Sequence, residues 1–241
     1  MEIQNKVVLI TGASAGIGLA AARRLAAAGA KVAVAARSVE KLNQLADELR
    51  AQGHDVLVVP TDMRNPAEVA RMVSATVEHY GRIDVLINNA GQAASGTVAE
   101  VDPEHYRQII ELNIFGPLHA IQAVVPMMRQ QGGGVIINVS SMVSKMNIPG
   151  LGTYASTKAA LNMLSATARV ELAPDNIRVI TVYPRMTATD FGKNSLGNRE
   201  MRQQQRSAAP RPGVVVDSAE YVADKILTAI QTEPAEQFMD M

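Results

Sequence analysis

Short runs of β-branched residues alternate with longer alanine- and leucine-rich stretches through most of the chain. Six runs have the composition of strands and are apolar at nearly every position: 6–11, 31–36, 55–60, 83–88, 134–140 and 177–183. A strand that is apolar on both sides is buried on both faces, which is typical of a parallel sheet covered by helices. The repeated strand–helix order predicts right-handed crossovers and therefore a doubly wound parallel sheet of the α/β class.

The stretches between these strands place apolar residues at helical spacing, as Leu42, Leu45 and Leu49 do. Helices are expected over about 16–29, 39–52, 66–80, 103–130, 153–173 and 217–232. Pro117 and Pro126 predict an interruption in the fourth helix, because proline lacks the amide hydrogen that a helix interior needs. The final QFMD stretch is expected to add a short strand.

Residues 1–241 are predicted to form a single domain, because no composition shift or linker marks a boundary. The one long stretch without periodicity is 184–216, which is rich in Arg, Gln, Asn, Gly and Pro. Long irregular segments in compact domains are typically lids or binding loops. We therefore expect 184–216 to border the substrate.

Composition excludes several functions. The 23 basic and 23 acidic residues balance to a net charge of zero, so no basic excess indicates nucleic acid. The chain has no cysteine and only four scattered histidines, and no metal site is expected. No apolar run approaches the ~18 residues of a membrane span, and the first strand pattern begins without a leader segment. These features predict a cytoplasmic protein without a nucleic-acid or membrane partner.

A glycine-rich turn, TGASAGIG (11–18), follows the first expected strand and opens the first helix. Gly12, Gly16 and Gly18 are spaced G-x-x-x-G-x-G, with Ser14 between the first two. Such a turn lets the backbone approach a pyrophosphate closely, and the helix N-terminus presents free N–H groups to the anion. The turn therefore predicts a binding site for a dinucleotide.

The same turn also matches G-x-S-x-G, the motif of hydrolases in which Ser14 would be the nucleophile. That arrangement needs earlier strands to supply an oxyanion loop, yet only one expected strand precedes Ser14. It also places the catalytic histidine late in the chain, whereas the four histidines lie at 54, 79, 105 and 119. A serine hydrolase is therefore the less favoured alternative.

The end of the second expected strand discriminates between the two nicotinamide cofactors. In NAD-binding sheets an Asp or Glu there holds the ribose 2′-hydroxyl. Here Ala35 and Ala36 are followed by Arg37 and Ser38. A guanidinium binds a 2′-phosphate bidentately, so the sequence favours NADP(H).

Tyr154 and Lys158 lie four residues apart in TYASTKAA, so a helix places both on one face. An ammonium beside a phenol stabilises the phenolate and lowers the phenol pKa from about 10. The pair is then a usable proton donor and acceptor. Tyr221 and Lys225 have the same spacing, so spacing alone does not identify the site.

Five motifs occur in a fixed order along the chain: TGASAGIG (11–18), NNAG (88–91), ELNIFG (111–116), INVSSM (137–142) and YASTK (154–158). In combination and order they resemble the short-chain dehydrogenase/reductase family over nearly the whole chain. The resemblance implies a Rossmann-type doubly wound sheet of about seven strands with helices on both faces. It also implies a nicotinamide cofactor.

The resemblance assigns the catalytic groups to Asn113, Ser141, Tyr154 and Lys158. Ser141 lies thirteen residues before Tyr154, as in the family, whereas Ala208 occupies the equivalent position before Tyr221. The implied reaction interconverts a ketone or aldehyde and an alcohol, with Tyr154 as general acid and base. Asn113 is expected to disrupt its helix and hold a water that connects Lys158 to solvent. A catalytically silent NADP-binding regulator is the alternative, which the intact set disfavours.

The resemblance also assigns cofactor contacts by position. The adenosine end is expected at Asp62, Met63, Asn89, Ala90 and Gly91. The pyrophosphate is expected beside Ile17, and the nicotinamide end near Pro184, Thr187 and Thr189; Tyr154 and Lys158 face it from the catalytic group.

Two departures from the family pattern stand out. Arg185 follows Pro184 where the family usually has glycine, and its side chain either enters the substrate cleft or points to solvent. The C-terminal TEPAEQFMDM lacks the glycines of the family's tetramer-forming end. We therefore expect a homo-oligomer, with dimerisation through the two long helices more secure than a tetramer.

Overall fold

The structure is a computed structural model, and it describes residues 1–197 and 215–240. The expected binding loop 184–216 thus lies partly outside the described residues. Within them, seven strands form one parallel sheet in the order β11-β7-β6-β4-β1-β2-β3. Their bounds are Val7–Thr11 (β1), Lys31–Ala36 (β2), Val56–Pro60 (β3), Val85–Asn88 (β4), Gly134–Val139 (β6), Ile177–Tyr183 (β7) and Glu236–Phe238 (β11). The predicted doubly wound sheet is confirmed.

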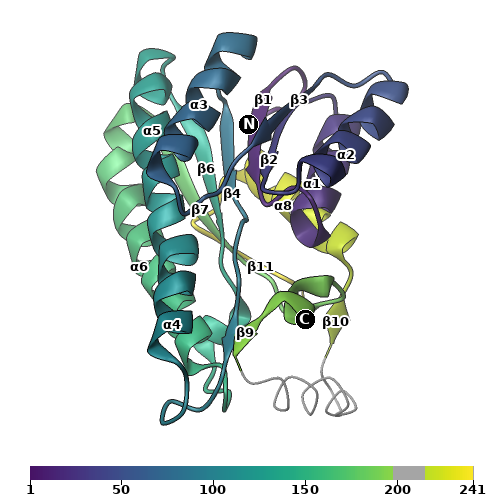
Figure 1. The fold of residues 1–241 in the computed structure, drawn as a ribbon. Helices are drawn as coiled ribbons and strands as arrows, with labels where there is room; N and C mark the ends of the chain where they lie inside the picture. The colour runs from purple at the N-terminus through teal and green to yellow at the C-terminus, as the bar shows by residue number, and fades with distance from the viewer. Residues whose placement is uncertain (198–214, 241) are drawn as a thin grey trace.

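Helices cover both faces of the sheet (Figure 1). On one face lie α1 (Gly16–Ala27), α2 (Val39–Ala51) and α8 (Ala219–Thr232), and on the other lie α3 (Pro66–Tyr80), α5 (Gly116–Gln130) and α6 (Gly152–Leu172). The short helix α4 (Pro103–Ile110) precedes α5. Every position of β1, β4 and β6 is buried, because each of these strands packs against helices on both sides.

The helical region 103–130 is interrupted, as its prolines predict, and the interruption ends two residues before Pro117. A π-helical turn, Glu111–Phe115, separates α4 from α5 and contains Asn113. Pro117 has no amide hydrogen to donate to the carbonyl of Asn113 four residues earlier, whereas Pro126 lies inside α5 without ending it. Pro126 is on the exposed side, where water can bind the carbonyl that proline leaves free.

The run from Pro103 to Gln130 has the expected bounds but is more apolar than the prediction of no membrane span implies. It is a helical run of 28 residues that could cross a membrane by length and composition. Ala120, Val124 and Met128 of this run are buried in the core against the sheet. Core helices of soluble proteins meet the same criterion, so the run is weak evidence for a membrane span.

The strand order reverses between β1 and β4. Helices leave β1 toward one face and β4 toward the other, which opens a crevice at the carboxyl ends of these two strands. Short elements gather at the same end: β5 (Ala94–Ser95) pairs with β9 (Leu196–Gly197), and β8 (Met186–Thr187) pairs with β10 (Val216–Asp217). Figure 1 shows β9 and β10 below the sheet.

Candidate active site

The glycine turn between β1 and α1 is built by close backbone contacts. Gly12 has φ +68°, and a Cβ there would lie 2.8 Å from Cα of Ala90. A Cβ on Gly18 would lie 2.4 Å from the carbonyl oxygen of Gly12. Side chains at these positions would collide with main chain, so the turn keeps the narrow approach that a pyrophosphate requires.

The N-terminus of α1 has no acceptor of its own. Its N-cap, Ala15, offers no side-chain hydrogen bond, and the first turn, which includes Ile17, has no acidic residue. By contrast, Asn65 caps α3, Asp102 caps α4 and Ser218 caps α8. The free N–H groups at the start of α1 therefore favour an anion in the crevice.

Thr11 and Asn89 join the glycine turn to the end of β4. The Asn89 side chain donates to the carbonyl oxygens of Thr11 (2.9 Å) and Gly12 (3.3 Å). The Thr11 hydroxyl accepts from the backbone N–H groups of Asn89 (3.0 Å) and Ala90 (3.1 Å). Thr11 is not among the site residues predicted from the sequence, although a polar residue at the end of an otherwise apolar strand is the signal that marks it.

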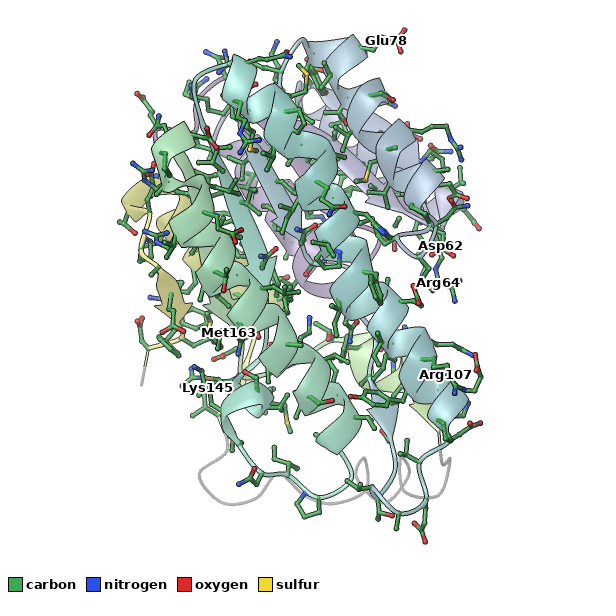
Figure 2. The ribbon with its side chains drawn as sticks, turned by 90° about the vertical axis from the view of Figure 1, so that its left-hand side faces the viewer. Asp62, Arg64, Glu78, Arg107, Lys145 and Met163 are labelled. Atoms are coloured by element: carbon green, nitrogen blue, oxygen red, sulfur yellow. The ribbon has the colours of Figure 1, made fainter. Side chains whose placement is uncertain are left out.

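The expected adenosine contacts differ in how they are placed. Arg37 is exposed immediately after β2, and Ser38 begins α2 without capping it by its side chain. Asp62 is bound by Arg64, with Nη2–Oδ2 at 2.6 Å and Nε–Oδ1 at 3.0 Å, and this hydrogen bonding lowers the pKa of Asp62. Figure 2 shows the two side chains next to each other. The side chain of Met63 is buried in the core.

The structure brings Ser141 and Tyr154 together. Ser141 follows β6 and starts a 3₁₀ turn, Met142–Lys145, while Tyr154 lies in the first turn of α6. The Ser141 side chain lies near the buried phenol of Tyr154 and favours a lower pKa of that phenol. Lys158 is buried one turn further along α6, and its Nζ donates to the carbonyl oxygen of Val139 at 2.8 Å.

The protonation of this pair differs from the sequence prediction. Burial raises the pKa of Tyr154 to about 12, and the nearby Ser141 side chain offsets only part of this. Burial likewise lowers the pKa of Lys158 to about 8. The predicted lowering of the phenol pKa by its lysine neighbour is therefore wrong, because desolvation of the buried phenol dominates and Nζ of Lys158 is held at the Val139 carbonyl.

Asn113 joins three parts of the site. Its Oδ1 accepts from the backbone N–H of Gln92 (2.9 Å), and its Nδ2 donates to the Gln92 carbonyl (2.8 Å) and to Oγ1 of Thr157 (3.0 Å). A Cβ built on Gly91 would lie 3.3 Å from Oδ1 of Asn113 and 3.5 Å from Nζ of Lys158. The π-helical turn thus points an amide at both the 91–92 segment and α6.

The segment after Pro184 folds over the crevice. The Pro184 carbonyl accepts from the N–H of Met142 at 2.9 Å. The Thr189 side chain lies against Gly16, and a Cβ built on Gly16 would lie 3.2 Å from it. The Thr187 hydroxyl donates to the carbonyl of Arg185. The Phe191 ring, expected from the sequence to line the substrate cleft, lies 5.6 Å from the Tyr154 ring between centroids.

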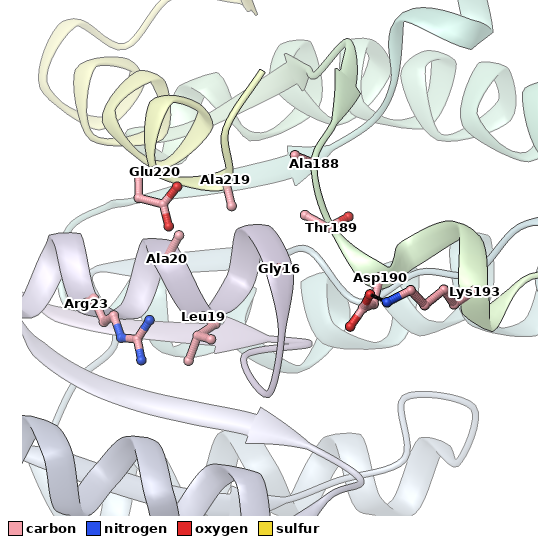
Figure 3. A pocket seen from close by; sticks show the side chains of 10 residues that line it. All are labelled: Gly16, Leu19, Ala20, Arg23, Ala188, Thr189, Asp190, Lys193, Ala219 and Glu220. Atoms are coloured by element: carbon pink, nitrogen blue, oxygen red, sulfur yellow. Dashed lines mark ion pairs between the residues drawn. The ribbon is translucent and has the colours of Figure 1, made fainter. Parts of the chain in front are cut away.

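Gly16 and Thr189 also border an open groove of about 520 Å³. Figure 3 shows the groove between α1 and the start of α8. Its other lining residues are Leu19, Ala20, Arg23, Ala188, Asp190, Lys193, Ala219 and Glu220. The groove therefore continues from the phosphate end of the crevice along α1.

Arg185 takes neither of its two expected positions. Its guanidinium forms a bidentate ion pair with Asp217, with Nη2–Oδ1 at 2.7 Å and Nε–Oδ2 at 3.0 Å. Asp217 is only 6% exposed. Together with the pairing of β8 and β10, the ion pair holds the two ends of segment 184–216 side by side.

The second Tyr–Lys pair serves the C-terminal segment. Nζ of Lys225 lies 2.6 Å from a carboxylate oxygen of Asp240, and the Tyr221 hydroxyl accepts from the Asp240 backbone N–H at 3.0 Å. Within the described part of the chain, Ser14 makes no hydrogen bond with a histidine, so the arrangement of a serine hydrolase is not formed there.

The crevice combines a glycine turn suited to an anion with a buried tyrosine beside a serine. This combination, at the point where the strand order of a parallel sheet reverses, is typical of oxidoreductases that use a dinucleotide. The family model for short chain dehydrogenase matches residues 6–200. The chain therefore belongs to the short-chain dehydrogenase/reductase family, and it is an oxidoreductase with a nicotinamide cofactor.

Individual relatives agree with this placement. The chain is 35% identical over 219 residues to an uncharacterized oxidoreductase of Listeria monocytogenes, covering 90% of this chain and 88% of that protein. A short-chain dehydrogenase/reductase from Burkholderia phymatum, in complex with NAD, has a TM-score of 0.90 at 27% identity and covers 99% and 90% of the two chains. L-sorbose reductase from Gluconobacter frateurii, complexed with NADPH and L-sorbose, has a TM-score of 0.86 at 30% identity and covers 100% and 97%.

Proposed function

We propose that this protein is an NADP(H)-dependent oxidoreductase that interconverts a small ketone or aldehyde and the corresponding alcohol. The observation that carries the proposal is the buried Tyr154 phenol, near the Ser141 side chain, at the carboxyl end of the sheet. Lys158 lies one turn away on the same helix, and the glycine turn of α1 opens into the same crevice.

The residues of the crevice fit a dinucleotide. The glycine turn leaves no room for side chains, and the start of α1 offers N–H groups to a pyrophosphate. The side chains of Arg37 and Ser38, after β2, are suited to a 2′-phosphate. The side chain of Thr189 lies against Gly16 of the glycine turn. The bound cofactor would supply the hydride.

In the reductive direction, Tyr154 donates its proton to the carbonyl oxygen of the substrate. The raised pKa of about 12 keeps the phenol protonated at neutral pH, which suits a general acid. Ser141 donates a hydrogen bond to the same oxygen and stabilises the negative charge that develops there. In the oxidative direction the phenol must lose its proton, and the charge of Lys158 in the same buried region stabilises the phenolate.

Asn113 supports this chemistry by holding neighbouring parts of the site in place. Its contacts with Gln92 and Thr157 fix the segment below the crevice relative to α6. We also propose that Asn113 binds a water molecule that would connect Lys158 to solvent. Phe191, packed beside Tyr154, favours substrates with an apolar group next to the carbonyl.

Oxidation of NADPH, followed at 340 nm with a panel of ketones and aldehydes, tests the reaction class. Tyr154→Phe should lower turnover by about 100-fold or more while the affinity for NADPH stays nearly unchanged. Wild-type turnover in this variant would refute the role of Tyr154. A wild-type chain that binds NADPH and reduces no carbonyl would favour the silent regulator instead.

The cofactor preference is tested by Arg37→Glu, which should weaken NADPH far more than NADH. A loss of about tenfold or more in the NADPH-to-NADH preference is expected, because the carboxylate repels the 2′-phosphate. Lys41→Glu makes the same change of charge one turn into α2 and controls for the general field. An equal effect of both variants, or no effect of Arg37→Glu, would contradict the assignment.

The proposal includes a cytoplasmic homo-oligomer. Phe115, Met163 and Val170 expose apolar side chains on the helices expected to dimerise, with Met163 69% exposed. Figure 2 shows Met163 on the outer side of α6. Light scattering of the wild type and of Met163→Glu tests this interface, and an unchanged mass in the variant would contradict it.

A further inference from the structure

Asn162 lies on α6 four residues after Lys158 and eight after Tyr154, so it occupies the same side of the helix. Its side chain bridges two serines on either side of Ser141. The Ser140 hydroxyl donates to Oδ1 of Asn162 at 2.5 Å, and Nδ2 of Asn162 donates to Oγ of Ser144 at 2.9 Å. Ser140 is buried at the end of β6, and Ser144 lies in the 3₁₀ turn.

The bridge continues to Ser141 itself. The hydroxyl of Ser144 donates to the carbonyl oxygen of Ser141 at 2.6 Å. Each group donates to the next, from the Asn162 amide through the Ser144 hydroxyl to the Ser141 main chain. The Ser141 segment is thereby attached directly to the helix that carries Tyr154.

This attachment has a chemical consequence. Ser141 and Tyr154 must reach one carbonyl oxygen, yet they belong to different elements. The other hydrogen bonds of residues 142–146 are the Met142 N–H with the Pro184 carbonyl (2.9 Å), the Val143 N–H with Oγ of Ser141 (3.3 Å), the Ser144 N–H with the Ser141 carbonyl (3.1 Å) and the Met146 N–H with the Val143 carbonyl (3.2 Å). None of these four bonds involves α6, so among the bonds of the 3₁₀ turn the one between Asn162 and Ser144 connects it to that helix.

We propose that Asn162 is a positioning residue that acts through Ser144 to hold Ser141 at its working distance from Tyr154. The inference rests on the proposed function, because it assigns Asn162 a part in the same reaction. A displacement of about 1 Å in such a group can lower turnover about 100-fold. Asn162 acts on the rate without contacting substrate or cofactor.

Two single variants break the bridge at different points. In Asn162→Asp the carboxylate still accepts from Ser140 but cannot donate, so Ser144 turns its hydroxyl toward it and the Ser141 carbonyl keeps only the backbone N–H of Ser144 (3.1 Å). Ser144→Ala removes the middle of the bridge. Each should lower kcat about tenfold or more, with NADPH affinity and melting temperature close to those of the wild type.

Two further measurements separate positioning from a general structural effect. In the double variant, kcat should fall no further than in the worse single variant, because both changes act on one connection. Hydrogen exchange of the Met142 and Val143 amides should accelerate in both single variants. Ser156→Ala is the control: its hydroxyl, on the same helix, bonds Tyr106 and the Thr153 carbonyl and has no connection to Ser141.

The proposal would be overturned if kcat were unchanged in both single variants, or if the losses of kcat were additive in the double variant. It would also be overturned if kcat fell in proportion to the melting temperature, or if exchange of the two amides were unchanged. Failure of the proposed function looks different, because the wild type is then inactive on every carbonyl or Tyr154→Phe remains active. Hydrogen exchange still reports in that case whether Asn162 holds the segment.

Discussion

Replacing Lys158 by methionine should stabilise the folded chain at neutral pH while removing its proposed activity. Lys158 is 4% exposed, and burial lowers its pKa from 10.5 to about 8. The protonated form therefore has a cost in the folded state that the unfolded chain does not have. Methionine has a similar length and is uncharged, so it fills the same space without that cost.

The magnitude follows from the two pKa values. Each pKa unit corresponds to about 1.4 kcal/mol, so the fall from 10.5 to about 8 corresponds to about 3 kcal/mol at pH 7. Loss of the hydrogen bond to the Val139 carbonyl offsets about 1–3 kcal/mol of this gain. A net gain of about 1 kcal/mol is expected, which raises the melting temperature by about 2–4 °C.

The pH dependence gives the sharper test. The unfolded chain keeps this lysine protonated up to about pH 10.5, whereas the folded chain releases the proton near pH 8. Between these values unfolding takes up a proton, so wild-type stability rises with pH relative to Lys158→Met. Between pH 7 and 9.5, the free energy of unfolding of the wild type should therefore rise by about 2 kcal/mol relative to that of Lys158→Met.

The assay is urea unfolding without cofactor, followed by circular dichroism at several pH values. Lys225→Met is the matched control, since Lys225 also follows a tyrosine by four residues on a helix. The ion pair with Asp240 raises the pKa of Lys225, so its contribution stays constant up to about pH 10.5 and is lost only above that. A stability difference for Lys158→Met that does not change between pH 7 and 9.5 would refute the reasoning.

Two further substitutions test how the crevice is built. Gly18→Ala places a methyl group 2.4 Å from the Gly12 carbonyl oxygen, and overpacking of this kind costs about 1–3 kcal/mol. Differential scanning fluorimetry should show a melting temperature lower by about 3 °C or more, whereas Gly192→Ala, which has open space around it, should change it by about 1 °C at most. Asp217→Asn removes the carboxylate that Arg185 binds and should lower the melting temperature by a few degrees; no change would show that the ion pair does not hold the segment ends.

Local patterns predicted the sheet well because each strand is marked by its own residues. Six strands begin and end within about two residues of the expected ranges, and the short final strand is present as β11. Buried parallel strands need apolar residues at every position, and that requirement is visible in the sequence without knowledge of their neighbours. The family resemblance then supplied the strand number and the arrangement of motifs.

The interruption near Asn113 is predicted by Pro117, but the contacts that the Asn113 side chain makes are not local. The π-helical turn lets the Asn113 amide bond Gln92 and Thr157, which lie 21 and 44 residues away in sequence. Helix propensity and proline positions carry no information about such contacts. Pro126 shows the opposite case, since an exposed position lets a helix continue through a proline.

Charged groups were the least predictable part of the site. The raised pKa of Tyr154 depends on how deeply α6 is buried, which the spacing of Tyr154 and Lys158 cannot give. Arg185 pairs with Asp217, 32 residues further along the chain, and Asp62 is bound by Arg64. Each outcome depends on which side chains the folded backbone brings within reach.

Because the N-terminus of α1 has no side-chain cap, the stability of the folded chain should depend on the concentration of an anion that binds there. A solute that completes the cap binds the folded chain alone, and at 100 times its dissociation constant it adds about 2.7 kcal/mol of stability. Cells short of the dinucleotide would then hold a chain that opens more often and is degraded sooner. Abundance of the enzyme should thus follow supply of its cofactor, with no regulator other than mass action.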